Sequence, residues 1–418
     1  MTTEFAPRVP GSRSVAARAL ICAGLATGES RLTNIPDCDD TTAIIRCLRG
    51  CSVEVHPSEP VTRVAGATSF APSPQSLNCA ASGTTMRFIA ALSLLTDRPM
   101  TLTGTPRLME RPMTGLYEAL NALGKEVDES PPCRRITGTP RIAGHVTVDA
   151  GTSGQFVSGL IMALAASGQA TMLRAERPAS KPFIAMTVAV MQEFGAEILM
   201  RADGSDLVFE IAGTGYKPAD FIVETDVMSA NYLLAAAAIT GRPVFIPNLR
   251  PETIQGDIAL LNVLESMGAT IEWRNGGVRS SRSSHTPLRG CTVDLSDMPD
   301  MALTIAALAA IADSPTIMLS TTILRYKESD RLNAIMVELT KLGAAVSVSD
   351  GGDTLTIVPA RKLQPAAIDT YDDHRMAMAF GLLTLVEPGI SIVDPGCVSK
   401  TWPQFFSELE RYAPAGAT

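Results

Sequence analysis

The chain has 418 residues, of which 46% are hydrophobic and 19% charged. This length suits two or three domains, and the composition excludes a disordered or fibrous protein. Lys and Arg total 35 against 43 Asp and Glu, for a net charge of -8. That balance excludes a general binder of nucleic acid or membrane surfaces, because such binders need basic stripes.

The chain shows no sign of export or of a metal scaffold. The segment 1–11 is short and polar, and the apolar run 19–26 is too short to span a bilayer. The eight cysteines are scattered without CxxC spacing, and only four histidines accompany them. We therefore expect a cytoplasmic protein with free thiols and neither a structural zinc site nor a disulfide framework.

One pattern recurs along the chain: an apolar helix, then a Gly or acidic residue, then a short strand. These markers lie 69 to 74 residues apart, at Gly28, Asp97, Gly168, Gly241, Asp313 and Glu387. A second helix in each repeat is expected to end at a glycine in the left-handed conformation, just before a strand. These glycines lie 71 to 75 residues apart, at Gly50, Gly124, Gly195, Gly268 and Gly343. The last helix is expected at 403–412.

The period is too long for a thin solenoid, and it indicates a compact α/β unit whose helices are buried against sheet. Six units nearly exhaust the 418 residues. They group most simply as three plus three. A crossover of the chain is expected where the segment 223–231 begins the fourth unit.

Each apolar helix is expected to begin about thirteen residues before its marker, at Val15, Thr84, Gln155, Met228, Asp300 and His374. The Ser, Thr, Asp and Asn residues around these positions are typical N-caps, so capping alone is one interpretation. Cations in or beside three of the first turns oppose the helix dipole and favour a second interpretation, the binding of phosphate or carboxylate. They are Arg13, Arg18, Arg87, His374 and Arg375.

Basic residues with embedded acids also occupy four connecting segments, 104–112, 179–183, 325–331 and 394–403. Solvated surface charge is the simple interpretation of each segment alone. Basic residues between Gly and Pro, with an acid among them, also suit oxyanion binding beside a carboxylate base. The sequence contains no P-loop, no GxGxxG and no nucleophile elbow.

In order along the chain, these motifs resemble those of the enolpyruvyl transferase family, most closely its 5-enolpyruvylshikimate-3-phosphate synthase (3-phosphoshikimate 1-carboxyvinyltransferase) branch. The similarity runs from Pro10 to Phe406 through PGSRS, SGTTMR, GTPRLMERP, SGQ, SKP, YKESDR, DDHRMAM and DPGCVSKTWP. It implies a two-domain inside-out α/β fold with six βαβαββ-type repeats, three per domain around a pseudo-threefold axis. The implied domains are 12–225, and 1–11 joined with 226–418, with an active site between domains that close on substrate.

The resemblance implies transfer of the enolpyruvyl group of phosphoenolpyruvate to a phosphorylated acceptor, first of all shikimate 3-phosphate, with release of phosphate. It implies small-molecule substrates, no metal or organic cofactor, and no nucleic-acid or membrane partner; a monomer is expected. The matching catalytic positions are Asp300, Glu328 and Arg13. The matching donor ligands are Arg13, Gly83, Arg111, Gln155, Arg331, Arg375 and Lys400. The matching acceptor ligands are Ser14, Arg18, Ser153, Gln155, Ser180, Asp300 and Lys327.

Two positions depart from the family pattern. Arg13 stands where the family usually has a lysine that is often assigned to proton transfer, and arginine is effectively never deprotonated. Ala81 stands where an asparagine is usual, so a polar contact near the donor is lost. The smaller departures vary within the family and weigh less; they are Gly154, Phe183 and Ile323.

These departures leave three functions open. The first is a shikimate-pathway enzyme with an atypical site, and the second is an enolpyruvyl transferase for another phosphorylated acceptor, such as UMP in nucleoside-antibiotic biosynthesis. The third is a catalytically silent binding paralogue, which Arg13 favours and the intact Asp300 and Glu328 oppose. A UDP-N-acetylglucosamine enolpyruvyl transferase is disfavoured because the segment 104–112 lacks the cysteine usual there. Which of Asp300 and Glu328 is acid or base stays open.

Overall fold

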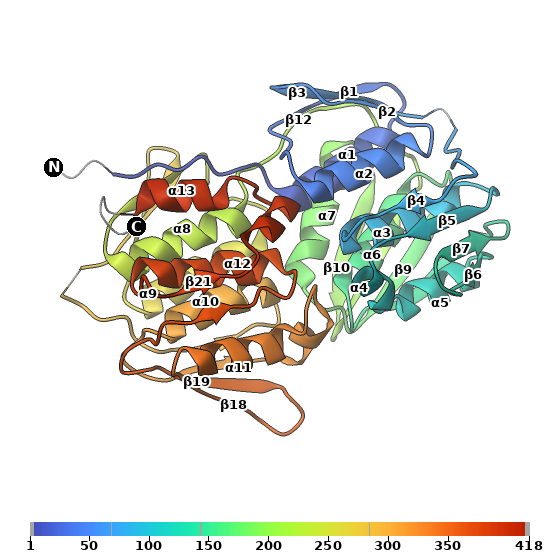
Figure 1. Ribbon diagram of the computed structural model, residues 1–418. Coiled ribbons are helices and arrows are strands. Elements are labelled where there is room, and N and C mark those ends of the chain that lie inside the picture. The colour runs from blue at the N-terminus through green and yellow to red at the C-terminus, as the bar shows by residue number, and fades with distance from the viewer. Residues whose placement is uncertain (1–3, 68, 143, 284, 414–418) are drawn as a thin grey trace. The chain divides into compact units, whose positions relative to one another are not determined.

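The computed structural model describes residues 4–67, 69–142, 144–283 and 285–413 and has a mixed α/β architecture, which confirms the predicted class (Figure 1). The chain divides into two compact units, which we call the 11–223 unit and the 224–418 unit; the second also includes residues 1–10. The arrangement of three repeats around a pseudo-threefold axis stays a prediction. Residues 1–3 and 414–418, which the sequence analysis assigns to the second domain, lie outside the described residues.

In the described part of the 11–223 unit, three four-stranded sheets share one pairing pattern. Their strand orders are β12-β1-β3-β2, β4-β5-β7-β6 and β8-β9-β11-β10. In each sheet the first two strands pair in parallel and the remaining pairs are antiparallel. The strands are β1 (Glu29–Thr33), β2 (Glu54–His56), β3 (Val61–Ala65), β4 (Leu77–Asn78), β5 (Met100–Thr103), β6 (Glu126–Asp128), β7 (Arg134–Thr137), β8 (His145–Asp149), β9 (Thr171–Glu176), β10 (Ile198–Asp203), β11 (Asp206–Ile211) and β12 (Asp220–Ile222).

The core of this unit contains three helices that are buried on nearly every side and are mostly apolar, as expected for core helices. They are α1 (Arg13–Leu25), α3 (Gly83–Ala91) and α6 (Gly154–Ala165). The N-cap serines Ser12, Ser82 and Ser153 accept hydrogen bonds from the first-turn amides, so the predicted helix starts are confirmed. The other helices are α2 (Asp39–Arg49), α4 (Pro106–Glu110), α5 (Thr114–Ala122), α7 (Lys181–Glu193) and the 3-10 turn η1 (Leu92–Leu95).

The described part of the 224–418 unit contains the sheets β13-β15-β14, β16-β17-β19-β18 and β20-β21. The four-stranded sheet repeats the pairing pattern of the 11–223 unit. Phe5 forms a parallel bridge with Val244 of β13 and packs against the ring of Tyr412, so the N-terminal segment runs beside the last helix, α13 (Phe405–Tyr412) (Figure 1). The strands are β13 (Val244–Pro247), β14 (Thr270–Arg274), β15 (Gly277–Ser281), β16 (Thr292–Asp294), β17 (Thr316–Leu319), β18 (Ala345–Val348), β19 (Thr354–Val358), β20 (Ala367–Ile368) and β21 (Ser391–Ile392).

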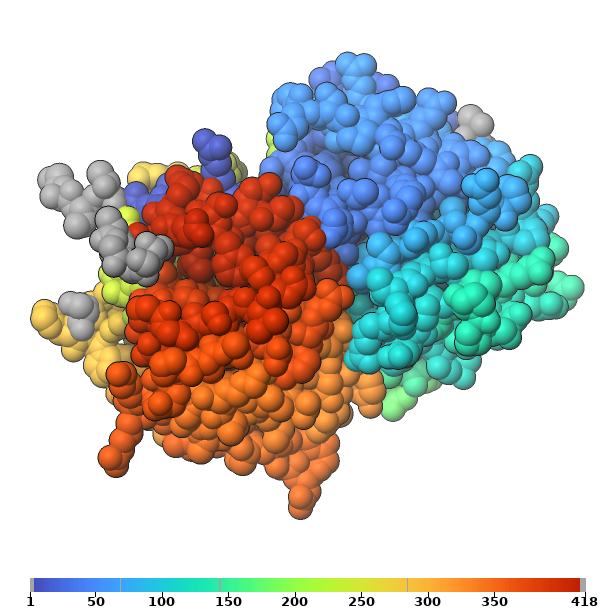
Figure 2. All heavy atoms as spheres, in the orientation of Figure 1, coloured from blue at the N-terminus to red at the C-terminus, as the bar shows by residue number. Residues whose placement is uncertain are grey.

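Buried helices again form the centre of this unit. In α8 (Val227–Thr240) every residue from 227 to 239 is buried, and Figure 2 shows orange and red segments covering the place where Figure 1 draws that helix. The other helices are α9 (Leu260–Ser266), α10 (Ala302–Ala309), α11 (Arg331–Lys341), α12 (His374–Gly381) and α13 (Phe405–Tyr412). The 3-10 turns are η2 (Gly256–Ala259), η3 (Pro299–Met301), η4 (Thr322–Tyr326), η5 (Leu382–Leu385) and η6 (Pro395–Lys400).

Four of the five helix-ending glycines have the predicted left-handed backbone; they are Gly124, Gly195, Gly268 and Gly343. The prediction for Gly50 is wrong, because its φ is -65° and Ser52 takes the left-handed conformation two residues later. Close packing explains the glycine instead: a Cβ at Gly50 would lie 2.5 Å from a methyl group of Leu77.

Two further observations concern the whole chain. All eight cysteines are free thiols, five of them buried. Among the residues that the structure describes, none of the helices combines the length and the apolar character that crossing a membrane requires.

Candidate active site

Six predicted site residues belong to the 224–418 unit, and Arg331 is at their centre. Its guanidinium is fully buried at the start of α11 and donates to three carboxylates. Nε and Nη2 bind Asp373 at 2.8 and 3.2 Å, Nη1 binds Asp300 at 2.8 Å, and Nη2 binds Glu328 at 2.9 Å. These acids raise the pKa of Arg331 although burial opposes them. Arg331 therefore acts first as a fixed cation that holds the two predicted catalytic carboxylates in place.

Asp300 lies in η3, one turn before α10, and is surrounded by cations. Its Oδ1 is 3.0 Å from the ammonium of Lys327, and its Oδ2 is 3.8 Å from Nη2 of Arg375. Burial alone would raise the pKa of Asp300, but Lys327, Arg375 and Arg331 outweigh it and hold the pKa well below its usual range. Asp300 is thus a carboxylate that accepts hydrogen bonds, not an acid that donates a proton.

Glu328 and Lys400 form a looser pair beside this cluster. The ammonium of Lys400, at the end of η6, is 3.6 Å from Oε1 of Glu328, whose other oxygen accepts from Arg331. Both side chains are largely buried. Glu328 thus lies between two cations, Arg331 and Lys400.

Arg375 differs from Arg331 because its close polar partners are mostly neutral groups instead of carboxylates. Nη1 donates to the hydroxyl of Tyr232 at 3.3 Å, and Nη2 contacts the sulfur of Met228 at 3.4 Å. Asp300, at 3.8 Å, is the nearest carboxylate found for it in the described part of the chain. A buried guanidinium without a close carboxylate is suited to bind an anionic ligand.

Eight predicted site residues belong to the 11–223 unit. Arg18, buried in α1, donates from Nε to the hydroxyl of Thr187 at 2.7 Å and from Nη1 to the carbonyl of Ser14 at 2.8 Å. Nη2 donates to the carbonyl of Phe183 at 3.1 Å, and the guanidinium lies over the ring of Phe88. Burial lowers the pKa of Arg18 to about 9. Its hydrogen-bond partners are neutral oxygens, so an anion would gain a strong electrostatic interaction here.

Two arginines approach the start of α3. A Cβ added to Gly83 would lie 2.6 Å from Nη1 of Arg111 and 3.0 Å from Nη1 of Arg87. Arg87 also donates to the side-chain oxygen of Gln155 at 2.6 Å, and the amide nitrogen of Gln155 donates to the hydroxyl of Thr84 at 2.9 Å. The structure thus brings three predicted donor ligands together around a helix N-terminus, where backbone N–H groups favour an anion.

Arg13, the first residue of α1, pairs with Asp40 in the first turn of α2. Both side chains are largely buried. Two of the predicted serine ligands differ in their local structure. Ser153 caps α6, whereas Ser180 adopts a left-handed backbone before α7 and its side chain makes no capping bond.

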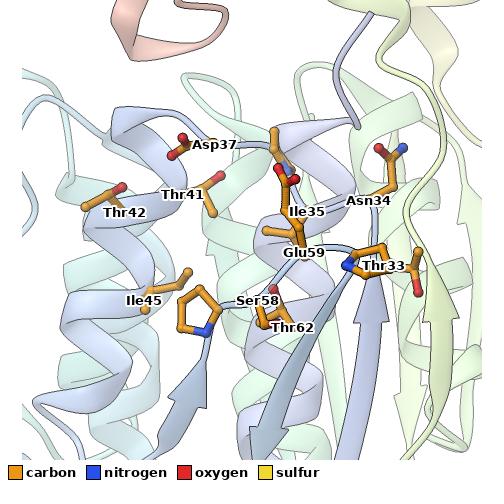
Figure 3. Close-up of a pocket in the computed structure, with 13 residues that line it drawn as sticks. Thr33, Asn34, Ile35, Asp37, Thr41, Thr42, Ile45, Ser58, Glu59 and Thr62 are labelled. Carbon is orange, nitrogen blue, oxygen red and sulfur yellow. The ribbon is translucent and has the colours of Figure 1, made fainter.

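A separate hollow of about 560 Å³ lies beside β1 and α2 (Figure 3). Asn34 and Asp37 follow β1, Thr41 comes from α2, and Ser58 and Glu59 come from the loop after β2. None of the predicted site residues lines it. Its charged lining residues are the acids Asp37 and Glu59, and no Lys or Arg of the described residues lines it, so it does not suit an anionic substrate.

Sequence reasoning left several residues of these clusters out of the site. Asp40 and Asp373 hold predicted ligands, Arg87 supports Gln155, and Asp257 is a buried acid beside Asp300. The sequence marks Arg87 as a cation in a first turn and Asp373 as part of DDHRMAM, but the partners of both residues lie far away in sequence. Within the described residues, no group of three or more His, Cys, Asp and Glu is arranged to hold a metal ion.

Comparison with known proteins agrees with these motifs. A sequence profile of EPSP synthase (3-phosphoshikimate 1-carboxyvinyltransferase) matches residues 6–409. The chain is 40% identical over 411 residues to a protein of Photobacterium profundum named 3-phosphoshikimate 1-carboxyvinyltransferase, covering 96% of this chain and 94% of that one. A protein of the same name from Serratia proteamaculans is 39% identical over 415 residues, covering 96% and 95%.

Two solved structures share the fold. An EPSP synthase of Acinetobacter baumannii superposes with a TM-score of 0.77 at 21% identity, covering 98% of this chain and 96% of that one. The enolpyruvyl transferase NikO of Streptomyces tendae gives a TM-score of 0.74 at 18% identity, covering 98% and 94%. Together with the profile match and the sequence relatives, they place the chain in a family: it belongs to the EPSP synthase (3-phosphoshikimate 1-carboxyvinyltransferase) family.

Proposed function

We propose that the chain is a 3-phosphoshikimate 1-carboxyvinyltransferase, which transfers the enolpyruvyl group of phosphoenolpyruvate to shikimate 3-phosphate and releases phosphate. One observation carries the proposal: relatives 38 to 40% identical over 96% of the chain bear that name. The clusters of buried cations support it, because both substrates are small anions that need several fixed cations. The domains are 12–225, and 1–11 with 226–418, and the enzyme works as a cytoplasmic monomer.

In this proposal the donor is held by Arg375 and Lys400. Arg375 has no ion pair with a carboxylate closer than 3.8 Å among the described residues, and Lys400 adds a second, largely buried positive charge. Arg111 and the amide of Gly83 bind phosphate at the start of α3. Arg331 contributes mainly by its field, because all three of its nitrogens already donate to carboxylates.

Asp300 takes the proton of the acceptor hydroxyl. In the structure its pKa is held low by Lys327, Arg375 and Arg331. Anionic substrates that bind these cations offset their field, so the pKa of Asp300 rises and the carboxylate becomes a better base once both substrates are present. Asp300 therefore becomes a stronger base in the complex that contains both substrates, which is the complex that reacts.

The proton that reaches the methylene carbon of the donor does not come from Arg13, because a guanidinium keeps its protons. Arg13 instead supplies charge beside Asp40. We assign that proton transfer to Glu328, which contacts Arg331 and Lys400. In this assignment Glu328 is protonated when the donor binds, gives its proton to the methylene carbon during addition and recovers it during elimination.

The test is an acceptor assay. Purified protein is incubated with phosphoenolpyruvate and either shikimate 3-phosphate, UMP or no acceptor, and released phosphate and the enolpyruvyl product are both measured. We expect equal amounts of the two with shikimate 3-phosphate and neither with UMP. Asp300→Asn should lower kcat about a hundredfold or more, whereas Asp350→Asn, at an exposed turn, should not. Turnover only with UMP would establish the second acceptor class, and turnover with neither would indicate a silent paralogue.

A further inference from the structure

Asp257 is a buried acid that the roles above do not use. It lies in η2, in the 224–418 unit, and is 1% exposed. Among the described residues neither of its carboxyl oxygens has a hydrogen-bond partner. An unpartnered buried carboxylate is costly, and it is more costly than the same group in its neutral form.

The backbone around Asp257 is firmly held. The preceding Gln255 accepts a hydrogen bond from the amide of Val227 at the start of α8. Its amide nitrogen donates to Glu224 at 3.0 Å and to the carbonyl of Thr225 at 2.8 Å. Asp257 therefore cannot reach solvent by a small shift of its own turn.

Four charged groups from four other elements act electrostatically on Asp257. They are Asp300 in η3, Arg375 in α12, Asp226 before α8 and Lys327 after η4. The charges of the two acids and the two cations sum to zero, so an ionised Asp257 would add one uncompensated buried negative charge. Accordingly, burial first and Asp300 second raise the pKa of Asp257 to about 7.

The turn that holds Asp257 and the side chain of Arg375 both contact the start of α8. Gln255 accepts from the amide of Val227 there, and Nη2 of Arg375 contacts the sulfur of Met228. Arg375 has no ion pair with a carboxylate closer than 3.8 Å among the described residues, and it donates to a neutral hydroxyl. Its Nε is buried and without a partner among the described residues. A second negative charge beside Arg375 would attract that guanidinium and repel an anionic ligand.

We propose that Asp257 is a positioning residue whose carboxyl group keeps its proton in the working enzyme and so leaves Arg375 to the anionic donor; this rests on the proposed function. Loss of that proton at higher pH weakens donor binding. The residue does not touch the reacting atoms and acts through Arg375 and Asp300.

The experiment compares the wild-type protein with Asp257→Asn, a neutral side chain of the same shape. KM for phosphoenolpyruvate is measured from about pH 6 to about pH 8, a window centred on the pKa of Asp257. We expect the ratio of wild-type to variant KM to rise about tenfold for each pH unit above the pKa. Titration of the donor itself cancels in this ratio. A merely structural residue would shift KM equally at every pH, so a flat ratio would overturn the proposal.

A second readout does not depend on turnover. The infrared spectrum of the wild-type protein should contain the carbonyl band of a buried neutral carboxyl that disappears near pH 7. Asp257→Asn should lack this band, and the control Asp350→Asn should retain it. A band that persists in Asp257→Asn, or no band in the wild type, would overturn the proposal.

The KM ratio and the infrared band together distinguish a failure of the proposed function from a failure of the proposal for Asp257. If the wild-type protein releases no phosphate with either acceptor, the proposed function fails while the infrared titration still decides the protonation of Asp257. If Asp257→Asn does not fold, Asp257→Ser replaces it in both measurements, and the wild-type band decides if that variant also fails.

Discussion

Arg13 shows how one substitution changes the demands on the residues around it. Its guanidinium pairs with Asp40 across the first turns of α1 and α2. A lysine could form one contact of this kind and could also release a proton, which arginine cannot do. The arginine therefore preserves charge at this helix start and removes a possible proton carrier.

We predict that Arg13→Lys keeps or raises kcat with shikimate 3-phosphate, because it restores an ionisable ammonium without removing the positive charge. Steady-state kinetics with both substrates varied will measure this. Arg201→Lys, at an exposed ion pair on β10, is the matched control. A thousandfold loss, about 4 kcal/mol of transition-state stabilisation, would show that the site requires the guanidinium.

For single residues, the sequence predicts which side chains belong to functional motifs but not which of these side chains contact one another. Arg331 could be predicted as a ligand from YKESDR, yet its bidentate partner Asp373 lies 42 residues away. Asp257 gave no signal, because an aspartate after a glycine is typical of a turn. Its burial depends on how η2 packs against α8 and α9, and no local pattern encodes that.

Helix starts were predictable because their signals are local. Ser12, Ser82 and Ser153 cap α1, α3 and α6 where the apolar runs begin. The failure at Gly50 has a tertiary cause, since Leu77 from another strand excludes a side chain there. A glycine after a helix can therefore reflect either a left-handed backbone or close packing against a neighbouring side chain, and the sequence does not distinguish the two.

Two glycines at equivalent helix starts should respond differently to alanine. In Gly83→Ala the new methyl group meets the mobile ends of Arg111 and Arg87, whereas in Gly154→Ala it meets the backbone carbonyl of Ala179 at 2.5 Å. We expect Gly83→Ala to fold normally and to raise KM for phosphoenolpyruvate about tenfold or more, the effect of losing one charge-assisted hydrogen bond.

Gly154→Ala should instead lower the free energy of unfolding by about 1–3 kcal/mol, because the backbone must move. Urea denaturation followed by circular dichroism, together with kinetics, measures both effects. An unchanged KM in Gly83→Ala would remove Arg111 and the α3 start from donor binding.

At the scale of the whole molecule, buried acids of opposite behaviour set the pH dependence of the 224–418 unit. The pKa of Asp300 is lowered, so its contribution to stability is present above its usual pKa of 3.8 and is lost at lower pH. The pKa of Asp257 is raised to about 7, so its contribution is full below 3.8 and is lost as pH rises through about 7.

We predict that the free energy of unfolding of this unit falls between about pH 4 and about pH 7, by at most about 4 kcal/mol from Asp257. Asp257→Asn should flatten this fall. Both tryptophans, Trp273 and Trp402, belong to the 224–418 unit, so tryptophan fluorescence during urea denaturation reports on it selectively. If the free energy of unfolding of the wild type and of Asp257→Asn depends on pH in the same way, the raised pKa of Asp257 is contradicted.

The pairing of Phe5 with Val244, and of Phe5 with Tyr412, has a consequence for synthesis on the ribosome. The first ten residues emerge early, but their partners follow only after the entire 11–223 unit has been translated. At roughly 5–20 residues per second, that segment waits about 12–48 s for its strand partner Val244. The 224–418 unit, whose first residues are synthesised first, is therefore completed last, and Phe5 stays unpaired while the 11–223 unit is synthesised.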